Sequence, residues 1–81
     1  MSDEPSEIAT VVAIIVSVAP EAKDEVTTID HSSDVFEDLG LDSMDHLAVM
    51  TEIAEQTGIE IPEREYSRLR SVASIAERIT V

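Results

Sequence analysis

Hydrophobic residues recur at helical spacing in three stretches of the chain, of which the first lies near the N-terminus. Between residues 3 and 19, one helix face would hold Ile8, Val11, Val12, Ile15 and Ala19. Ser2 and Asp3 are suitable N-cap residues, Pro5 suits a first turn, and Pro20 should end the helix. The many β-branched residues would also suit a strand, but no partner strand is found, so we predict a helix.

The second stretch is predicted to form a helix from Ser43 to Thr57, with Gly58 as its C-cap. Its apolar stripe consists of Val49, Met50 and Ile53. The neighbouring face holds Met44, Leu47 and Thr51. The acidic residues expected on the outside are Asp45, Glu52 and Glu55. His46 is expected to be a partly exposed helix residue.

The third stretch follows a short extended segment, Ile59–Pro62. Pro62 can open a brief helix that carries Tyr66 and Leu69, and Ser71 should cap a last helix. That last helix would place on one face Val72, Ile75, Ala76 and Ile79.

The polar connection over residues 21–41 is predicted to be a long packed loop between the first two helices. Its apolar residues are Val26, Ile29, Val35, Phe36 and Leu39. Such a long loop usually has a function or hides a short turn of helix. The fold predicted is all-α, a small four-helix bundle of three main helices and one short helix, in a single domain over residues 1–81.

The net charge of the chain restricts the kinds of molecule that it can bind. The chain carries a formal net charge of −13, and residues 1–60 hold fifteen acids and only one base, Lys23. Nucleic acids and anionic membranes would be repelled, whereas partners with basic docking patches would be attracted. Cysteine is absent, and no apolar stretch is long enough to span a membrane, so we expect a cytoplasmic protein.

Ser43 is the main candidate for chemistry, because a glycine-containing turn leads directly into the helix that it should begin. A phosphate ester on its hydroxyl would face free backbone N–H groups and the positive end of the helix dipole. A hydrolase based on Ser43, His46 and Asp45 is a weaker alternative, since Asp45 would point about 100° around the helix from His46.

Metal binding is a second alternative, because acidic residues and one histidine crowd the region before and around Ser43. An EF-hand beginning at Asp30 would need glycine at Val35 and glutamate at Leu41, and it has neither. We therefore expect weak, unspecific Ca²⁺ or Mg²⁺ association and no dedicated metal site.

The segment Glu37–Asp45 resembles the phosphopantetheine attachment motif of acyl carrier proteins, usually written D-L-G-x-D-S-L-D. The similarity continues in Gly58–Glu63, which matches the family's I-x-I-P-x segment. Ser71 and Val72, with Ile75, resemble the opening of the family's last helix. The resemblance covers nearly the whole chain and indicates a free-standing acyl carrier domain.

The resemblance implies that Ser43 receives 4′-phosphopantetheine from coenzyme A through a phosphopantetheinyl transferase. The terminal thiol of that arm would hold acyl groups as thioesters, so the chain would be a monomeric carrier rather than an enzyme. Recognition by the transferase and by acyl-transferring and synthase enzymes would involve Asp42, Met44, Asp45, Leu47, Glu52 and Glu55. By analogy, an acyl pocket would lie near Met50, Ile53, Ile61 and Leu69.

The sequence also departs from the family pattern. Met44 replaces the usual leucine, and Ala48 and Ala54 stand where many fatty-acid carriers have glutamate. Thr57 replaces a large apolar residue, and His46 a common threonine. The sequence does not decide whether such a carrier serves fatty-acid, polyketide or specialised lipid pathways. Two alternative functions also remain: an aminoacyl or peptidyl carrier and, in a different class, an acidic helical adaptor without a cofactor.

Overall fold

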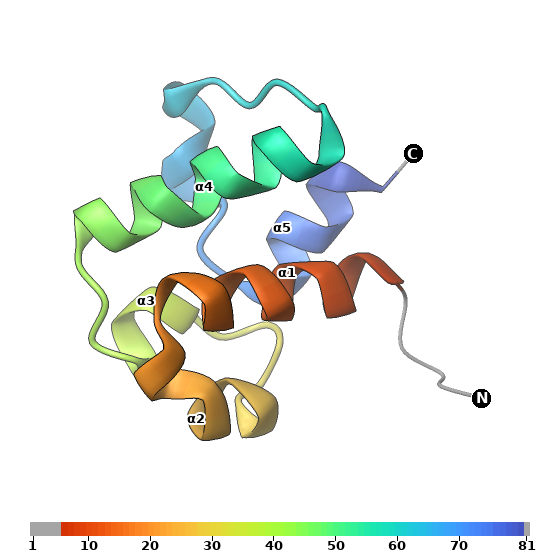
Figure 1. Cartoon of the computed structure of the whole chain (residues 1–81). Helices are drawn as coiled ribbons and strands as arrows, with labels where there is room; N and C mark the ends of the chain where they lie inside the picture. The colour runs from red at the N-terminus through yellow and green to blue at the C-terminus, as the bar shows by residue number, and fades with distance from the viewer. Residues whose placement is uncertain (1–5, 81) are drawn as a thin grey trace.

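A computed structural model describes residues 6–80, and within them the chain forms helices and turns but no strand (Figure 1). Residues 6–80 form five α-helices and two 3₁₀ helices (η). In chain order these are α1 (Ser6–Val18), η1 (Pro20–Ala22), α2 (Lys23–Thr28), α3 (Val35–Asp38), α4 (Ser43–Thr57), η2 (Glu63–Arg68) and α5 (Val72–Ile79). The prediction of an all-α helical bundle is confirmed. None of the helices in this range is long and apolar enough to cross a bilayer.

Helix α1 supplies one side of the core and contacts both α4 and α5, with α1 and α4 running in opposite directions (Figure 1). Val11, Ile14 and Ile15 are fully buried, so their β-branched side chains pack within a helix rather than a strand. The helix ends before Pro20, where η1 begins. The proposed caps Ser2 and Asp3 and the first-turn Pro5 lie outside the described residues.

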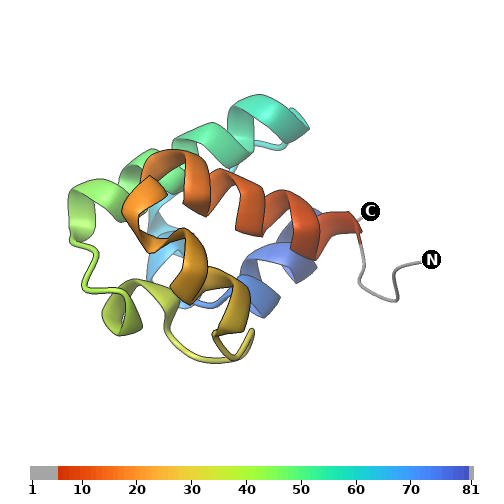
Figure 2. The same cartoon turned by 60° about the horizontal axis from the view of Figure 1, so that its bottom comes forward.

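The connection between α1 and α4, predicted as a long loop, is largely helical, and this part of the prediction is corrected. It contains η1 and α2, which follow one another directly, and α3, which a turn over residues 29–34 separates from α2. The reason is burial: Val26, Val35 and Phe36 are fully buried, and short helices satisfy the backbone while directing these side chains inward. Figure 2 shows α3 at the end of the bundle from which α4 starts.

A glycine closes α3 and leads the chain into α4. Gly40 adopts a left-handed φ of 69°, which an L side chain rarely tolerates. The N–H of Gly40 donates to the Glu37 carbonyl over 3.1 Å, and the N–H of Leu41 donates to the Phe36 carbonyl over 2.7 Å. These two bonds form a Schellman motif, so Gly40 has a structural role.

The C-terminal half follows the predicted pattern closely. Gly58 caps α4 with a φ of 72°, and Ser71 caps α5 in a capping box with Ser74. The residues of α5 that face the core are the predicted Val72, Ile75, Ala76 and Ile79. The short helix predicted after Pro62 is η2, and Leu69 lies just beyond its end rather than within it.

Candidate functional site

Ser43 is the first residue of α4 and is exposed to solvent. Two acidic residues form a capping box around it: the Asp42 carboxylate accepts from the Asp45 N–H over 3.0 Å, and the Asp45 carboxylate accepts from the Asp42 N–H over 3.3 Å. Both carboxylates therefore stabilise the start of the helix. Sequence reasoning missed this capping pair, although an acidic residue three positions after an N-cap is its usual signal.

The first turn of α4 leaves backbone donors beside Ser43. The Asp42 side chain takes the Asp45 N–H, and the Asp42 carbonyl takes the His46 N–H over 3.0 Å. Within residues 6–80, the N–H groups of Ser43 and Met44 have no acceptor, as expected at a helix N-terminus. A phosphate ester on the exposed Ser43 hydroxyl fits this position, because these donors and the helix dipole favour a negative group.

Two apolar side chains stand exposed next to Ser43. Met44 is 76% exposed and Leu47 is 46% exposed, and they are the only large hydrophobic residues exposed in the described part of the chain. Of the acidic positions proposed for partner recognition, Asp42 and Glu55 are exposed, whereas Asp45 and Glu52 are half-buried. The outer side of α4 thus combines an apolar anchor with a negatively charged surround, an arrangement typical of docking sites.

His46 lies inside the bundle, so the expectation of a partly exposed side chain is wrong. It is 6% exposed, and its ring lies against Phe36 with ring centres 4.2 Å apart. His46 precedes Val49 and Met50 by three and four residues, so the periodicity already placed it on the apolar stripe. Its polarity concealed this, because burial requires a partner that only the tertiary structure supplies.

That partner is the chain between η2 and α5. The Nε2 of His46 lies 3.0 Å from the Leu69 carbonyl oxygen, which can only accept, so Nε2 carries the proton. The Arg70 guanidinium approaches Nδ1 at 3.5 Å and also donates to the Asp34 carboxylate over 2.6 Å. Burial lowers the pKa of His46, the bond to Leu69 opposes that shift, and the charge of Arg70 lowers the pKa further.

These contacts contradict the hydrolase alternative. Both nitrogens of His46 face residues 69 and 70, and within the described chain no hydrogen bond joins this ring to Ser43 or Asp45. Asp45 is instead committed to the helix N-terminus. Without a base aligned on the hydroxyl, Ser43 is not an activated nucleophile.

The acidic residues before α4 are used for local structure. The Asp30 carboxylate accepts from the N–H and hydroxyl of Ser32, which lowers the pKa of Asp30. Asp34 accepts from Arg70 and from the Glu37 N–H, and the Arg70 bond is the main cause of its lowered pKa. In the described range, no group of three or more His, Asp or Glu side chains could hold a metal ion.

The four residues proposed for an acyl pocket lie together in the interior. Met50 and Ile53 of α4 are fully buried, and Ile61 and Leu69, which flank η2, are 7% and 6% exposed. All four belong to one hydrophobic core. Their use by an acyl chain stays a prediction.

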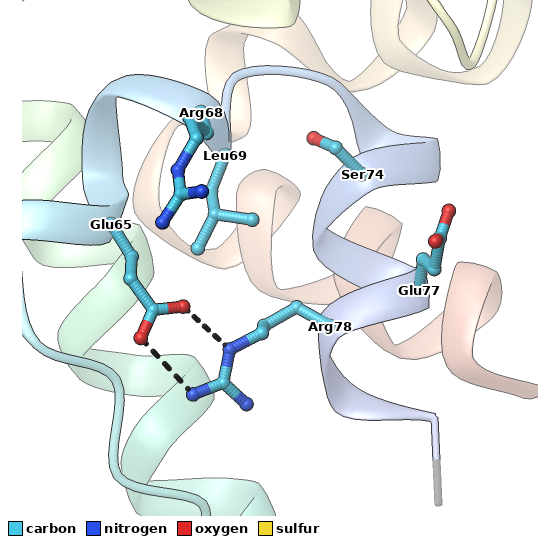
Figure 3. A pocket seen from close by; sticks show the side chains of 6 residues that line it. All are labelled: Glu65, Arg68, Leu69, Ser74, Glu77 and Arg78. Atoms are coloured by element: carbon cyan, nitrogen blue, oxygen red, sulfur yellow. Dashed lines mark hydrogen bonds and ion pairs between the residues drawn. The ribbon is translucent and has the colours of Figure 1, made fainter.

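A surface hollow of about 420 Å³ lies between η2 and α5, with Leu69 in its wall (Figure 3). Arg78 of α5 crosses it and donates to both carboxylate oxygens of Glu65, over 2.7 and 3.4 Å. This ion pair lowers the pKa of Glu65 and raises that of Arg78. The hollow therefore has a charged rim and one apolar side chain that it shares with the core.

Comparisons with known proteins agree with this geometry. A family model described as a phosphopantetheine attachment site matches residues 9–79. An acyl carrier protein of Campylobacter hominis is 36% identical over 73 residues, which cover 90% of this chain and 85% of that protein. Acyl carrier proteins of Campylobacter fetus and Rickettsia bellii are 33% and 29% identical, over 90% and 82% of this chain and 87% and 77% of theirs. No solved structure gives a significant match. The chain therefore belongs to the acyl carrier protein family, as a carrier with a covalently attached 4′-phosphopantetheine group rather than an enzyme.

Proposed function

We propose that Ser43 is the residue that bears the 4′-phosphopantetheine group. The observation that supports it is the position of this serine, exposed at the first residue of α4 between the two carboxylates of the capping box. Neighbouring backbone N–H groups would hold the phosphate, and the capping box would keep the first turn fixed. The attached group supplies a terminal thiol, which a chain without cysteine cannot provide itself.

The outer side of α4 is proposed as the docking surface for the transferase and for acyl-transferring and synthase enzymes. Met44 and Leu47 would fill apolar depressions on a partner, and the acidic residues around them would meet basic patches. The carboxylates that extend this surface are Asp42, Asp45, Glu52 and Glu55. A net charge of −13 would speed such encounters and make them sensitive to salt.

The interior beneath η2 is proposed to receive the acyl chain of the cargo. Met50, Ile53, Ile61 and Leu69 would contact it, because they come from α4 and from the two ends of η2 and belong to one hydrophobic core. An acyl chain that leaves water for this core gains roughly 0.8 kcal/mol for each buried methylene group. The thioester would then be carried with its apolar part shielded from solvent.

We also propose that the chain is a single carrier domain, monomeric and located in the cytoplasm, which serves fatty-acid, polyketide or specialised lipid synthesis. The monomeric state is supported by the small apolar surface, since Met44 and Leu47 are the large hydrophobic residues exposed in the described chain. A stable apolar dimer interface needs on the order of 800 Å² from each partner.

Intact mass measurement tests the assignment of Ser43. Incubation with coenzyme A and a broad-specificity phosphopantetheinyl transferase should add one phosphopantetheine mass to the protein. Ser43→Ala should gain none, and Ser6→Ala, which alters another serine that begins a helix, should behave as the wild type. Modification of Ser43→Ala, or no modification of the wild type, would contradict the assignment.

A further inference from the structure

The η2 segment contacts the core through its half-buried Tyr66 and through the residues at its two ends. None of its own residues is buried, and the buried apolar residues Ile61 and Leu69 flank it. Because Tyr66 is the only residue of η2 that packs against the core, the polar contacts that tie this segment to its neighbours contribute much of its attachment. Two side chains from other helices supply such contacts, Arg78 from α5 and His46 from α4.

Arg78 ties the N-terminal part of η2 to α5. Its guanidinium makes two bonds to Glu65 (Figure 3). It also donates to the Glu60 carbonyl over 3.3 Å. The ion pair lowers the pKa of Glu65 and raises that of Arg78, so both groups stay charged throughout the neutral and mildly acidic range. This attachment is insensitive to pH between about 5 and 8.

His46 ties the C-terminal end of η2 to α4. Its Nε2–H donates to the Leu69 carbonyl over 3.0 Å, and its Nδ1 accepts from Arg70 over 3.5 Å. Arg70 is in turn fixed by the Asp34 carboxylate, and its own carbonyl accepts from the Val35 N–H over 2.9 Å. The connection over residues 69–71 is thus joined to α4 and α3 through one buried imidazole and one guanidinium.

We propose that His46 is an acid-sensitive latch, which in its neutral form fixes the end of η2 to α4 and on protonation releases it. The second proton would sit on Nδ1, and it would replace an acceptor with an N–H that faces the N–H groups of Arg70. The guanidinium of Arg70 would then have to move away, which also disturbs its bond to Asp34. Leu69 lies next to this contact and belongs to the hydrophobic core, so its release would uncover part of that core.

The groups that surround the imidazole decide the direction of the effect. Arg70 from the connection opposes protonation, Asp34 at the start of α3 favours it, and Phe36 and Tyr66 present aromatic rings, with the Tyr66 ring centre 5.7 Å away. Burial has the largest influence, and the pKa of His46 lies below its ordinary value of 6.5. The neutral form is therefore favoured by the folded state, and stability is lost as the pH falls below about 6.5.

This direction is opposite to that expected from the acidic surface, because protonation of carboxylates reduces self-repulsion. The latch itself does not require phosphopantetheine, but its consequence for cargo rests on the proposed function. Release of η2 in mild acid would open the interior proposed to hold the acyl chain.

Amide hydrogen exchange in the full-length unmodified chain, measured by NMR at pH 7.0 and 5.5, tests the latch. Protection factors, which correct for the intrinsic pH dependence of exchange, should fall about tenfold for the N–H groups of Leu69 and Val35. The Ala19 N–H, bonded to the Ile15 carbonyl over 2.8 Å, should keep its protection. His46→Gln keeps a donor for the Leu69 carbonyl but does not titrate, so it should abolish this local loss.

His31→Gln serves as the matched control, because it removes the other histidine, and it should leave the loss unchanged. The latch is refuted if His46→Gln shows the same loss as the wild type, or if protection is constant over this range. Should His46→Gln fail to fold, the wild-type titration still decides: the His46 ring signals and the amides of residues 66–70 must shift with one common midpoint. Because all measurements use unmodified protein, they stand apart from the mass test of Ser43.

Discussion

Near its start, α4 reverses the arrangement of a simple amphipathic helix, in which apolar residues face the core and polar residues face water. On the outward face, the apolar Met44 and Leu47 are exposed, whereas on the inward face the polar His46 is buried. Farther along, the helix returns to the usual arrangement, with Val49, Met50 and Ile53 fully buried. The inversion is confined to the turns next to Ser43.

Each half of the inversion has a different physical basis. His46 can be buried because the Leu69 carbonyl and Arg70 satisfy both ring nitrogens, so no polar atom of the ring is left without a partner. Within the described chain, Met44 and Leu47 remain exposed to water, and contact of their apolar surface with water costs free energy. An exposed apolar pair at this place is expected where another protein covers it.

The largest difference in stability is expected between two variants that each truncate one apolar residue, one on the inward face of α4 and one on the outward face. Ile53→Ala creates a cavity in the core and should lower the free energy of unfolding by about 2–5 kcal/mol. Leu47→Ala should change it by less than about 0.5 kcal/mol, because the side chain is 46% exposed. Urea unfolding followed by circular dichroism measures both values.

In a docking assay the ranking of these two variants should reverse, with Leu47→Ala having the larger effect. Leu47→Ala should lower kcat/KM for modification by the transferase about fivefold, which corresponds to roughly 1 kcal/mol of contact energy. Gln56→Ala, an exposed change near the other end of the same helix, is the control and should have little effect. Equal modification rates for Leu47→Ala and the wild type would remove Leu47 from the docking surface.

A smaller effect should separate the two roles of Asp42. Asp42→Ala removes the N-cap of α4 and should destabilise the protein by about 1 kcal/mol, whereas Asp42→Asn keeps a capping oxygen and should stay near the wild type. Thermal unfolding measures the difference. If the charge of Asp42 also serves the transferase, both variants should be modified more slowly; a normal rate for Asp42→Asn would restrict Asp42 to capping.

Removal of a single surface charge should have the smallest effect on stability. The excess of carboxylates over the first sixty residues should destabilise the fold at low salt, and 0.1 M salt screens charges beyond about 10 Å. Glu55→Gln, on the exposed side of α4, should raise stability by a few tenths of a kcal/mol at low salt and by nothing at high salt. Melting temperatures that do not change with salt or Ca²⁺ would contradict this account.

The core of the C-terminal half could be predicted from the sequence because local rules determined it. Ser71 and Gly58 are strong boundary signals, and the spacing of Val72, Ile75, Ala76 and Ile79 allows only one helix face. The connection before α4 was harder, because α3 contains four residues and its stability comes from burying Val35 and Phe36. Short helices of this kind depend on tertiary packing rather than on propensity.

By itself, the sequence determined the helical class, the bounds of α4 and α5, and the place of Ser43 at the start of a helix, since caps, glycines and apolar periodicity act over a few residues. The tertiary structure decided that His46, which the spacing places on the apolar stripe, is buried despite its polarity, and that Met44 and Leu47 remain exposed. The physical reason is that burial of a polar ring depends on acceptors and donors more than twenty positions away, at Leu69 and Arg70. The local pattern around residue 46 indicates the helix face, but it does not contain these partners.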